Sequence, residues 1–396
     1  MLSRPFRVLM MNTARQPVWD IFCTVIDNYG DIGVCWRLAR QLVAEHALTV
    51  RLWVDDLTVF RRICPTVNPQ SSIQNVSGVE VRAWSSDHGG IIPGDVVIEA
   101  FACQLPEQFV GNMAQRERQP VWINLDYLSA ESWVTGCHAL PSPHPHLPLT
   151  KYFFFPGFNA TTGGLLRESD LEDRRSAFCT SPDQRAAFWK KLHLAPPTAD
   201  TLTVSLFAYE NPALASLLEV WSQGATPVRC LAPETRTLPV IEVFAGQPLQ
   251  AGEVFRRGNL ELMILPFVPQ PDYDRLLWVC DMNFVRGEDS FVRAQWAAKP
   301  MVWHIYPQEE EAHQIKLAAF LELYCVGLNE ASSKAVRALF HTWNGTLGVE
   351  RITPDLWDQW VSSRPEIRSH AEDWAKSLSK QEDLCSSLVR FCSSKL

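Results

Sequence analysis

The chain has 396 residues, too many for one ordinary hydrophobic core, so its length predicts two domains. Hydrophobic residues make up 46% of it and charged residues 20%, a balance that is typical of a folded globular protein and excludes intrinsic disorder. The formal net charge of −8 argues against non-specific nucleic-acid binding, which needs a basic surface, and suits a basic protein partner.

The eleven cysteines form no CxxC pair and have no metal-ligand spacing with histidine. Many lie in apolar runs, where cysteine behaves as a small buried hydrophobe in a reducing compartment. Residues 1–11 hold no apolar core long enough for a signal peptide. No stretch reaches the roughly 20 apolar residues that span a bilayer. We therefore expect a cytoplasmic protein without membrane contact and without a metal site.

Near the start of the chain, an apolar strand leads into an acidic loop. Residues 21–26 form the apolar run, and the loop after it holds Asp27, Gly30 and Asp31. The helix that follows carries apolar residues on one stripe, at Val34, Leu38 and Leu42. Strand, glycine-containing turn and helix open a doubly wound α/β domain, which binds ligands at the carboxyl ends of its strands. Two carboxylates would repel a phosphate, so the loop suits a cationic acceptor, although either aspartate alone is more simply a turn or cap residue.

Further apolar runs predict a parallel sheet with right-handed crossovers in the N-terminal half. The predicted strands cover residues 48–54, 79–84, 95–101 and 120–127. A loop rich in proline and histidine, an aromatic run and a mostly helical stretch follow, at 141–148, 151–158 and 169–194.

The alternation of strands and helices restarts after a linker at 195–198. Strands are predicted at 202–207, 227–231, 260–265, 280–284 and 301–305, helices at 212–221, 273–278 and 291–298, and the rest is largely helical. We therefore divide the chain into an N-terminal acceptor domain (1–194), a C-terminal donor domain (199–365) and a helical segment (366–396) that we expect to pack back on the N-terminal domain.

A second segment with chemical potential runs Arg286, Gly287, Glu288, Asp289, Ser290 between a predicted strand and a helix. The glycine permits a tight turn, and Asp289 or Ser290 is expected to cap the helix. The helix amino terminus is an anion site, to which Arg286 can add a charged fork for a diphosphate. A capped helix start without any ligand is the open alternative. No dinucleotide-binding fingerprint, P-loop or nucleophile elbow is present in the sequence.

Residues 19–40, 152–165, 202–211 and 265–306 together resemble the bacterial protein-arginine rhamnosyltransferases that modify elongation factor P, and the resemblance covers nearly the whole chain. It implies an α/β GT-B fold, in which two Rossmann-like domains with mainly parallel sheets face each other across a cleft. It also implies that L-rhamnose passes with inversion from dTDP-β-L-rhamnose to an arginine guanidinium of elongation factor P, which supports translation of polyproline stretches. Neither a cofactor nor a metal is implied.

Position by position, the resemblance makes Asp27 the general base, Asp31 a second essential acid and Glu288 a third acidic site residue. It assigns the donor contacts to Tyr209, Phe267, Gln270, Arg286, Asp289, Ser290 and Tyr306. A guanidinium is a poor nucleophile with a pKa above about 12, and paired carboxylates can grip it and accept its proton. We expect the acidic loop to lie in the acceptor half, away from the diphosphate.

Two other classes of function stay open from the residues alone. One is a different GT-B nucleotide-sugar transferase, or an epimerase, that acts on a small molecule. The other is a non-catalytic binding module of the same fold. Loss of Asp27 or Glu288 would have favoured the binding module, and both residues are present.

Overall fold

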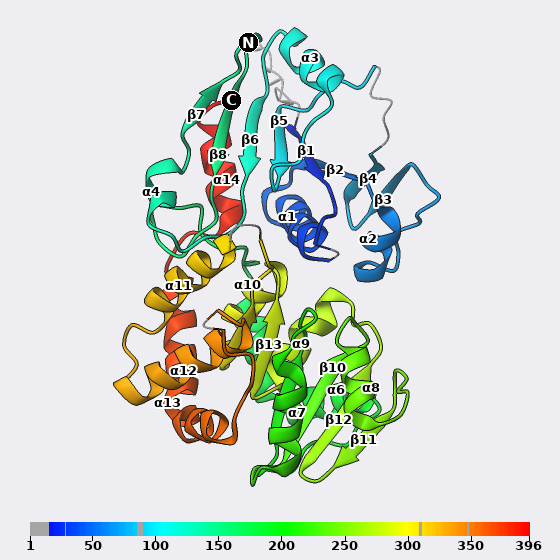
Figure 1. Ribbon diagram of the computed structural model, residues 1–396. Coiled ribbons are helices and arrows are strands. Elements are labelled where there is room, and N and C mark those ends of the chain that lie inside the picture. Colours follow the sequence, from blue (N-terminus) through cyan, green and yellow to red (C-terminus); the bar gives the residue numbers. More distant parts are fainter. Residues whose placement is uncertain (1–15, 28, 85–89, 309–310, 347) are drawn as a thin grey trace, which may run out of the picture.

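The computed structural model describes residues 16–27, 29–84, 90–308, 311–346 and 348–396. Residues 1–15, which the sequence analysis assigned to the N-terminal domain, and Asn28 of the acidic loop lie outside the described residues. The chain forms two lobes, each built on its own sheet (Figure 1). Both sheets are mainly parallel and are flanked by helices, so the predicted α/β architecture is confirmed.

The first sheet has eight strands in the order β3-β4-β2-β1-β5-β6-β8-β7. They are β1 (Val18–Cys23), β2 (Thr49–Val54), β3 (Ile73–Val76), β4 (Val79–Ala83), β5 (Val96–Ala100), β6 (Val121–Leu125), β7 (Pro141–Pro143) and β8 (Thr150–Phe154). Among the described strands of this sheet, only the edge strands β3 and β7 pair antiparallel, and β7 lies within the stretch 141–148 that was predicted to be loop. In the centre, Ile21 of β1 lies between Leu52 and Ile98, so the acidic loop starts from the middle of the sheet.

Helices cover both faces of this sheet. They are α1 (Gly30–His46), α2 (Leu57–Ile63), α3 (Glu107–Gln115) and α4 (Trp133–Cys137). The predicted stripe of α1, which includes Leu38 and Leu42, is fully buried. On the other face, Phe109 of α3 packs on Phe22 of β1, with ring centroids 4.8 Å apart. Because both faces are covered, the central strands read as continuous apolar runs.

The first strand lies earlier in the sequence than the apolar run 21–26 predicts, and the end of that run belongs to the loop. The Asp31 carboxylate accepts hydrogen bonds from the backbone N–H groups of Ile26 (2.9 Å) and Asp27 (2.8 Å). These bonds turn the chain out of the sheet after Cys23, and Ile26 is 60% exposed.

The second sheet has six strands in the order β11-β12-β10-β9-β13-β14. They are β9 (Leu202–Leu206), β10 (Val228–Pro233), β11 (Val254–Arg257), β12 (Leu260–Leu265), β13 (Met282–Arg286) and β14 (Met301–His304). All pairs are parallel except the edge hairpin of β11 and β12. Arg286 is the last residue of β13, so its side chain starts at the carboxyl edge of the sheet.

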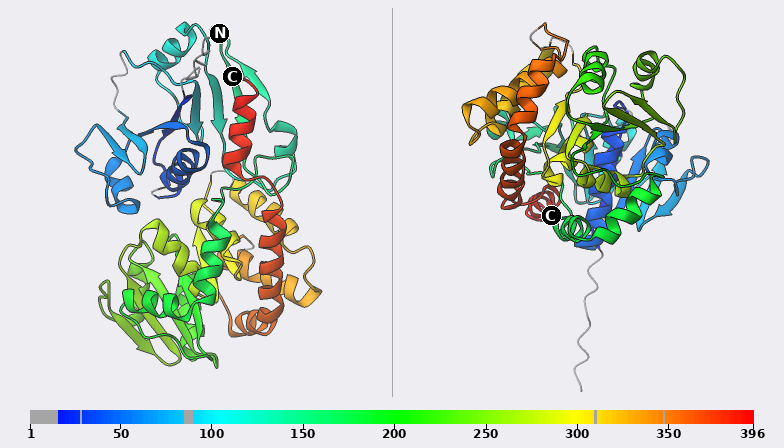
Figure 2. Two further views of the ribbon diagram at one scale, coloured as in Figure 1. Left: turned by 180° about the vertical axis from the view of Figure 1, so that it is seen from behind. Right: turned by 90° about the horizontal axis from the view of Figure 1, so that it is seen from below.

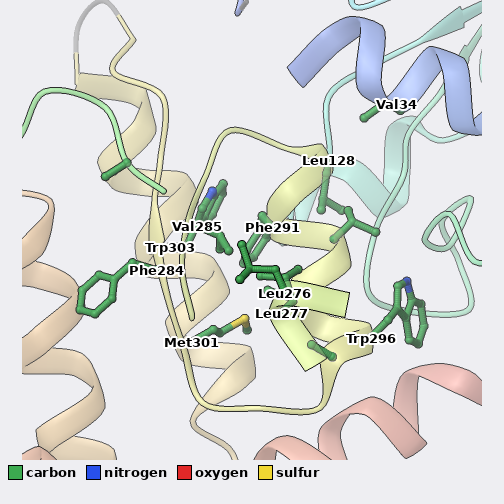
Figure 3. Close-up of a cluster of buried hydrophobic side chains, with 14 of the residues drawn as sticks. Val34, Leu128, Leu276, Leu277, Phe284, Val285, Phe291, Trp296, Met301 and Trp303 are labelled. Atoms are coloured by element: carbon green, nitrogen blue, oxygen red, sulfur yellow. The ribbon is translucent and has the colours of Figure 1, made fainter. Parts of the chain in front are cut away.

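The helices of the second lobe are α7 (Ala213–Gln223), α8 (Leu238–Ala245), α9 (Gln270–Val279), α10 (Asp289–Ala297), α11 (Ala312–Tyr324) and α12 (Glu330–Trp343). Figure 3 shows the apolar cluster around α10, which Val34 and Leu128 of the first lobe approach. Within it, Phe291 stacks on Trp303 with ring centroids 3.9 Å apart. This packing fixes the amino terminus of α10 directly after β13.

The remaining helices connect the lobes. They are α5 (Leu171–Thr180), α6 (Pro182–Lys191), α13 (Pro354–Ser379) and α14 (Leu384–Ser393). Phe178 of α5 packs on Trp278 of α9, so this helix contacts the second lobe although residues 1–194 were predicted as one N-terminal domain. The last helix, α14, returns to the first lobe (Figure 2). There the Phe391 ring lies 5.3 Å from that of Tyr152. No helix in the described part of the chain is long and apolar enough to cross a membrane.

Candidate active site

Two cavities between the lobes share Asp27 and Gly30 as part of their walls. The first, here called the aromatic cavity, is lined by Tyr29, Phe207, Phe267 and Tyr273 together with Gln270, Arg286, Asp289 and Ser290. The second, here called the acidic cavity, has a volume of about 480 Å³. Its lining includes Asp31, Glu288, Tyr127, Tyr306 and Lys316.

Both oxygens of the Asp27 carboxylate have a partner from the second lobe. Arg286 donates from Nη1 to Oδ1 at 3.0 Å, and the Tyr209 hydroxyl donates to Oδ2 at 2.5 Å. Burial raises the pKa of Asp27, and the charge of Arg286 opposes that rise. The acidic loop was expected to lie away from the proposed diphosphate residues, and this expectation is wrong for Asp27 and Arg286.

Two glycines allow the backbone to approach the Asp27 carboxylate. A Cβ atom on Gly30 would lie 2.8 Å from Asp27 Oδ2, and one on Gly287 would lie 2.5 Å from the same oxygen. Gly287 also has a φ of +60°, in the left-handed region that other residues avoid. The two glycines of the predicted site motifs therefore make room for the central carboxylate.

Asp31 shapes the loop and also lines the acidic cavity. One oxygen accepts the backbone N–H groups that turn the chain, and the Tyr127 hydroxyl donates to the other at 3.4 Å. Burial raises the pKa of Asp31, whereas the two backbone hydrogen bonds lower it. Tyr127 is held from behind by Phe101, with ring centroids 4.6 Å apart.

Glu288 faces the same cavity from the other lobe. Its Oε2 accepts a hydrogen bond from the backbone N–H of Leu128 at 2.9 Å. Burial raises its pKa to about 8, the Asp31 charge adds to the rise, and Lys316 opposes it. A cation that enters the acidic cavity would therefore meet carboxyl groups that are poised to ionise beside it.

Five of the seven predicted donor contacts line the aromatic cavity: Phe267, Gln270, Arg286, Asp289 and Ser290. Tyr306 lines the acidic cavity and is 42% exposed. Tyr209 is absent from the lining of both cavities and instead contacts Asp27. The predicted residues thus gather around one centre, but they divide between its two sides.

Polar side chains around the start of α10 line the aromatic cavity. Asp289 or Ser290 was predicted to cap this helix, but the N-cap position is Glu288, whose side chain makes no capping bond within the described structure. Ser290 Oγ instead accepts the backbone N–H of Arg286 at 3.1 Å. Arg286 Nε and Gln270 Oε1 are buried and lack a hydrogen-bond partner among the described residues. These atoms lie where a polar ligand would satisfy them.

A buried interlobe ionic cluster holds the loop and helix ends in place. Arg37 of α1 donates to Asp289 at 2.8 Å and to Asp274 at 3.1 Å. Arg293 of α10 contacts Asp274 and Glu168, each at 2.7 Å. Because Arg37 comes from the first lobe and Asp289 from the second, this cluster fixes how the two walls of the aromatic cavity face each other.

The sequence analysis did not identify several residues that line the two cavities. Phe207 and Tyr127 each end a predicted strand, and that position was the available signal, because ligands bind at the carboxyl ends of parallel strands. Lys316 comes from α11, and no local pattern connects it with the acidic loop. Among the described histidines, cysteines and acidic residues, no group of three or more is arranged to hold a metal ion.

Comparisons with known proteins identify the family. The family model described as Elongation-Factor P (EF-P) rhamnosyltransferase EarP matches residues 19–393. The protein-arginine rhamnosyltransferases of Pseudomonas putida and Pseudomonas aeruginosa are each 50% identical to this chain, over 95% and 94% of it and 98% of either relative. That of Shewanella oneidensis is 41% identical over 96% of this chain and 99% of the relative.

A solved structure agrees with these sequence relatives. It is described as the structural basis for EarP-mediated arginine glycosylation of translation elongation factor EF-P. Its TM-score is 0.69 at 37% identity, and the match covers 96% of this chain and all of the other (100%). The GT-B fold implied by the sequence resemblance is thereby confirmed. The relatives that are 50% identical to this chain are named protein-arginine rhamnosyltransferases, which are glycosyltransferases. The chain therefore belongs to the EF-P rhamnosyltransferase family EarP.

Proposed function

We propose that this enzyme transfers L-rhamnose from dTDP-β-L-rhamnose to an arginine guanidinium of elongation factor P. The observation that carries this proposal is the position of Asp27, which lines both the aromatic and the acidic cavity. A nucleotide sugar in the first cavity and an arginine in the second would meet at this carboxylate. The names of the relatives and the description of the family support the same reaction.

The aromatic cavity has the chemistry of a nucleotide-sugar site. Phe207 and Phe267 present rings to a base, and Arg286 and the amino terminus of α10 present positive charge to a diphosphate. As the sugar–phosphate bond breaks, negative charge develops on the leaving dTDP. Arg286 and the helix end would stabilise that charge, and we therefore propose that the reaction needs neither a metal nor a cofactor.

The acidic cavity has the chemistry of an arginine site. Asp31 and Glu288 would hold the guanidinium, whose charge favours the ionised form of each carboxyl group. The guanidinium nitrogen attacks the anomeric carbon from the side opposite dTDP, so the configuration inverts. A new N–C bond forms, the C–O bond to dTDP breaks, and Asp27 takes the nitrogen proton.

The decisive measurement is the intact mass of purified elongation factor P after incubation with the enzyme and dTDP-rhamnose. We expect one deoxyhexose increment, which peptide mapping places on an arginine, and equal product in the presence of EDTA. Asp27→Asn should lower kcat at least about 100-fold, as expected for loss of a general base. Donor hydrolysis with unmodified elongation factor P would instead favour a small-molecule acceptor, and no turnover at all would favour a binding module.

We place the reaction in the cytoplasm, where thiols stay reduced and where modified elongation factor P would support translation of polyproline stretches. All eleven cysteines are free in the structure, which agrees with a reducing compartment.

A further inference from the structure

We propose that Arg286 and Asp27 form a latch which the donor diphosphate must open before Asp27 can act as the base. The inference rests on the proposed function and adds how that site is regulated. In the structure Arg286 occupies one oxygen of Asp27 and Tyr209 the other. Each oxygen thus already accepts one strong donor, and the charge of Arg286 makes the carboxylate a weaker base toward an acceptor nitrogen. The same guanidinium is the strongest candidate for holding the diphosphate.

The remaining edge of Arg286 is ready to bind an anion. Its Nε lies buried without a hydrogen-bond partner among the described residues. Its guanidinium carbon lies 4.5 Å from the ring centroid of Phe207 and 4.4 Å from that of Tyr209. These rings keep the group at the wall of the aromatic cavity, where a diphosphate oxygen would compete with Asp27 for it.

The aromatic cavity is mostly filled by its own side chains in this state. Its volume is about 60 Å³, whereas pockets for small ligands usually measure about 300–1,000 Å³. Tyr29 of the first lobe closes it by packing on Phe267 of the second, with ring centroids 4.9 Å apart. Because Tyr29 lies in the same loop as Asp27, a donor that separates these rings also draws Asp27 away from Arg286.

The charges in the site also favour this exchange of partners. One guanidinium serves two anions, so binding of the diphosphate weakens the ion pair with Asp27. The charge of Arg286 lowers the pKa of Asp27 against the effect of burial, so losing this partner makes the carboxylate a stronger base. The acceptor arginine then brings a second guanidinium, which takes the place of Arg286 beside Asp27. The carboxylate thus exchanges one cation for another in the course of the reaction.

Calorimetry of dTDP binding tests the latch. Removing the Asp27 charge frees Arg286, so Asp27→Asn should bind dTDP about fivefold more tightly or better, the lower end of typical coupling between sites. Asp126→Asn is the matched control: it removes a nearby carboxylate that bonds the backbone N–H of Tyr127 rather than Arg286. Its dTDP affinity should match that of the wild type. In an Arg286→Gln background, Asp27→Asn should have no effect on dTDP affinity.

The possible results distinguish failure of the latch from failure of the proposed donor site. If Arg286→Gln weakens dTDP binding while Asp27→Asn leaves it unchanged or weaker, the latch is refuted and the donor site stands. If Arg286→Gln leaves dTDP affinity unchanged, the assignment of the donor site itself fails.

A measurement on the wild-type enzyme does not depend on whether the variants fold. Because dTDP frees Asp27 to bind the acceptor guanidinium, saturating dTDP should raise the affinity for elongation factor P about fivefold or more, the lower end of typical coupling between sites. Equal affinity with and without dTDP would contradict the latch.

Discussion

Replacing Gly287 with alanine should displace the Asp27 carboxylate, the proposed base, while every side chain that lines the two cavities is kept. The added Cβ would lie 2.5 Å from Asp27 Oδ2 and 3.0 Å from the Tyr209 hydroxyl. Ordinary carbon–oxygen contacts are about 3.3 Å or longer, so the carboxylate has to move by roughly 1 Å. A misplacement of that size at a reacting group costs about 100-fold in rate, and we expect kcat to fall by about that factor.

Backbone strain has to be separated from this displacement. Alanine in the left-handed region costs about 1–2 kcal/mol wherever it stands. Gly246 supplies the control, because it has a φ of +73° at the end of α8 and nothing lies within 4 Å of its added Cβ. Gly246→Ala should lose similar folding free energy in urea unfolding but keep its kcat for elongation factor P.

The comparison has a clear refuting result. A folded Gly287→Ala enzyme with wild-type kcat would show that the position of Asp27 does not set the rate. Equal losses of kcat in both glycine variants would show that strain alone explains the effect.

Three further changes probe other parts of the site. Arg37→Met removes the ion-pair partner of Asp289 among the described residues, whereas Asp274 keeps Arg293, and it should lower the free energy of unfolding by about 3 kcal/mol in urea denaturation. The exposed ion pair of Arg390 should contribute less than about 1 kcal/mol. Glu288 has a pKa raised from 4.5 to about 8, so the folded state keeps a proton that the unfolded state loses. Stability should therefore fall as pH rises through this window, and unfolding at several pH values should show that Glu288→Gln removes the fall. Tyr127→Phe loses the bond to Asp31 and should raise KM for elongation factor P roughly threefold or more in steady-state kinetics, with dTDP affinity unchanged.

The long elements were predictable because their apolar residues recur at a fixed period. The strand 202–207 and the helix around Leu38 are examples. The strand is buried on both faces and the helix along its apolar stripe, so burial imposes a pattern on each. The short elements were not, and β3, β7, β11, α2 and α4 are mainly at the edges or the surface, where burial imposes little pattern. The end of β1 was misplaced because apolar Ile26 continues the run after hydrogen bonds to Asp31 have already ended the strand.

The parts of the site were predictable one by one, because Asp27 lies in the loop that follows a buried parallel strand and Arg286 ends another. The contact between Asp27 and Arg286 was not predictable. The two residues belong to different sheets and are 259 positions apart, so the distance between them depends on how the lobes pack. The interlobe ionic cluster around Arg37 sets that packing, and nothing in its local sequence distinguishes it from a solvated arginine.

This dependence on lobe packing fits the difficulty of the proposed chemistry. An arginine stays protonated at any physiological pH, so a carboxylate near it binds the cation long before it removes a proton. A permanently free Asp27 between two cavities would attract any cation that entered. In the proposed latch, the ion pair with Arg286 of the other lobe would keep Asp27 neutralised until a diphosphate arrives, and the diphosphate would enter as Tyr29 leaves Phe267. The residue proposed to recognise the donor would thereby also decide when the acceptor can react.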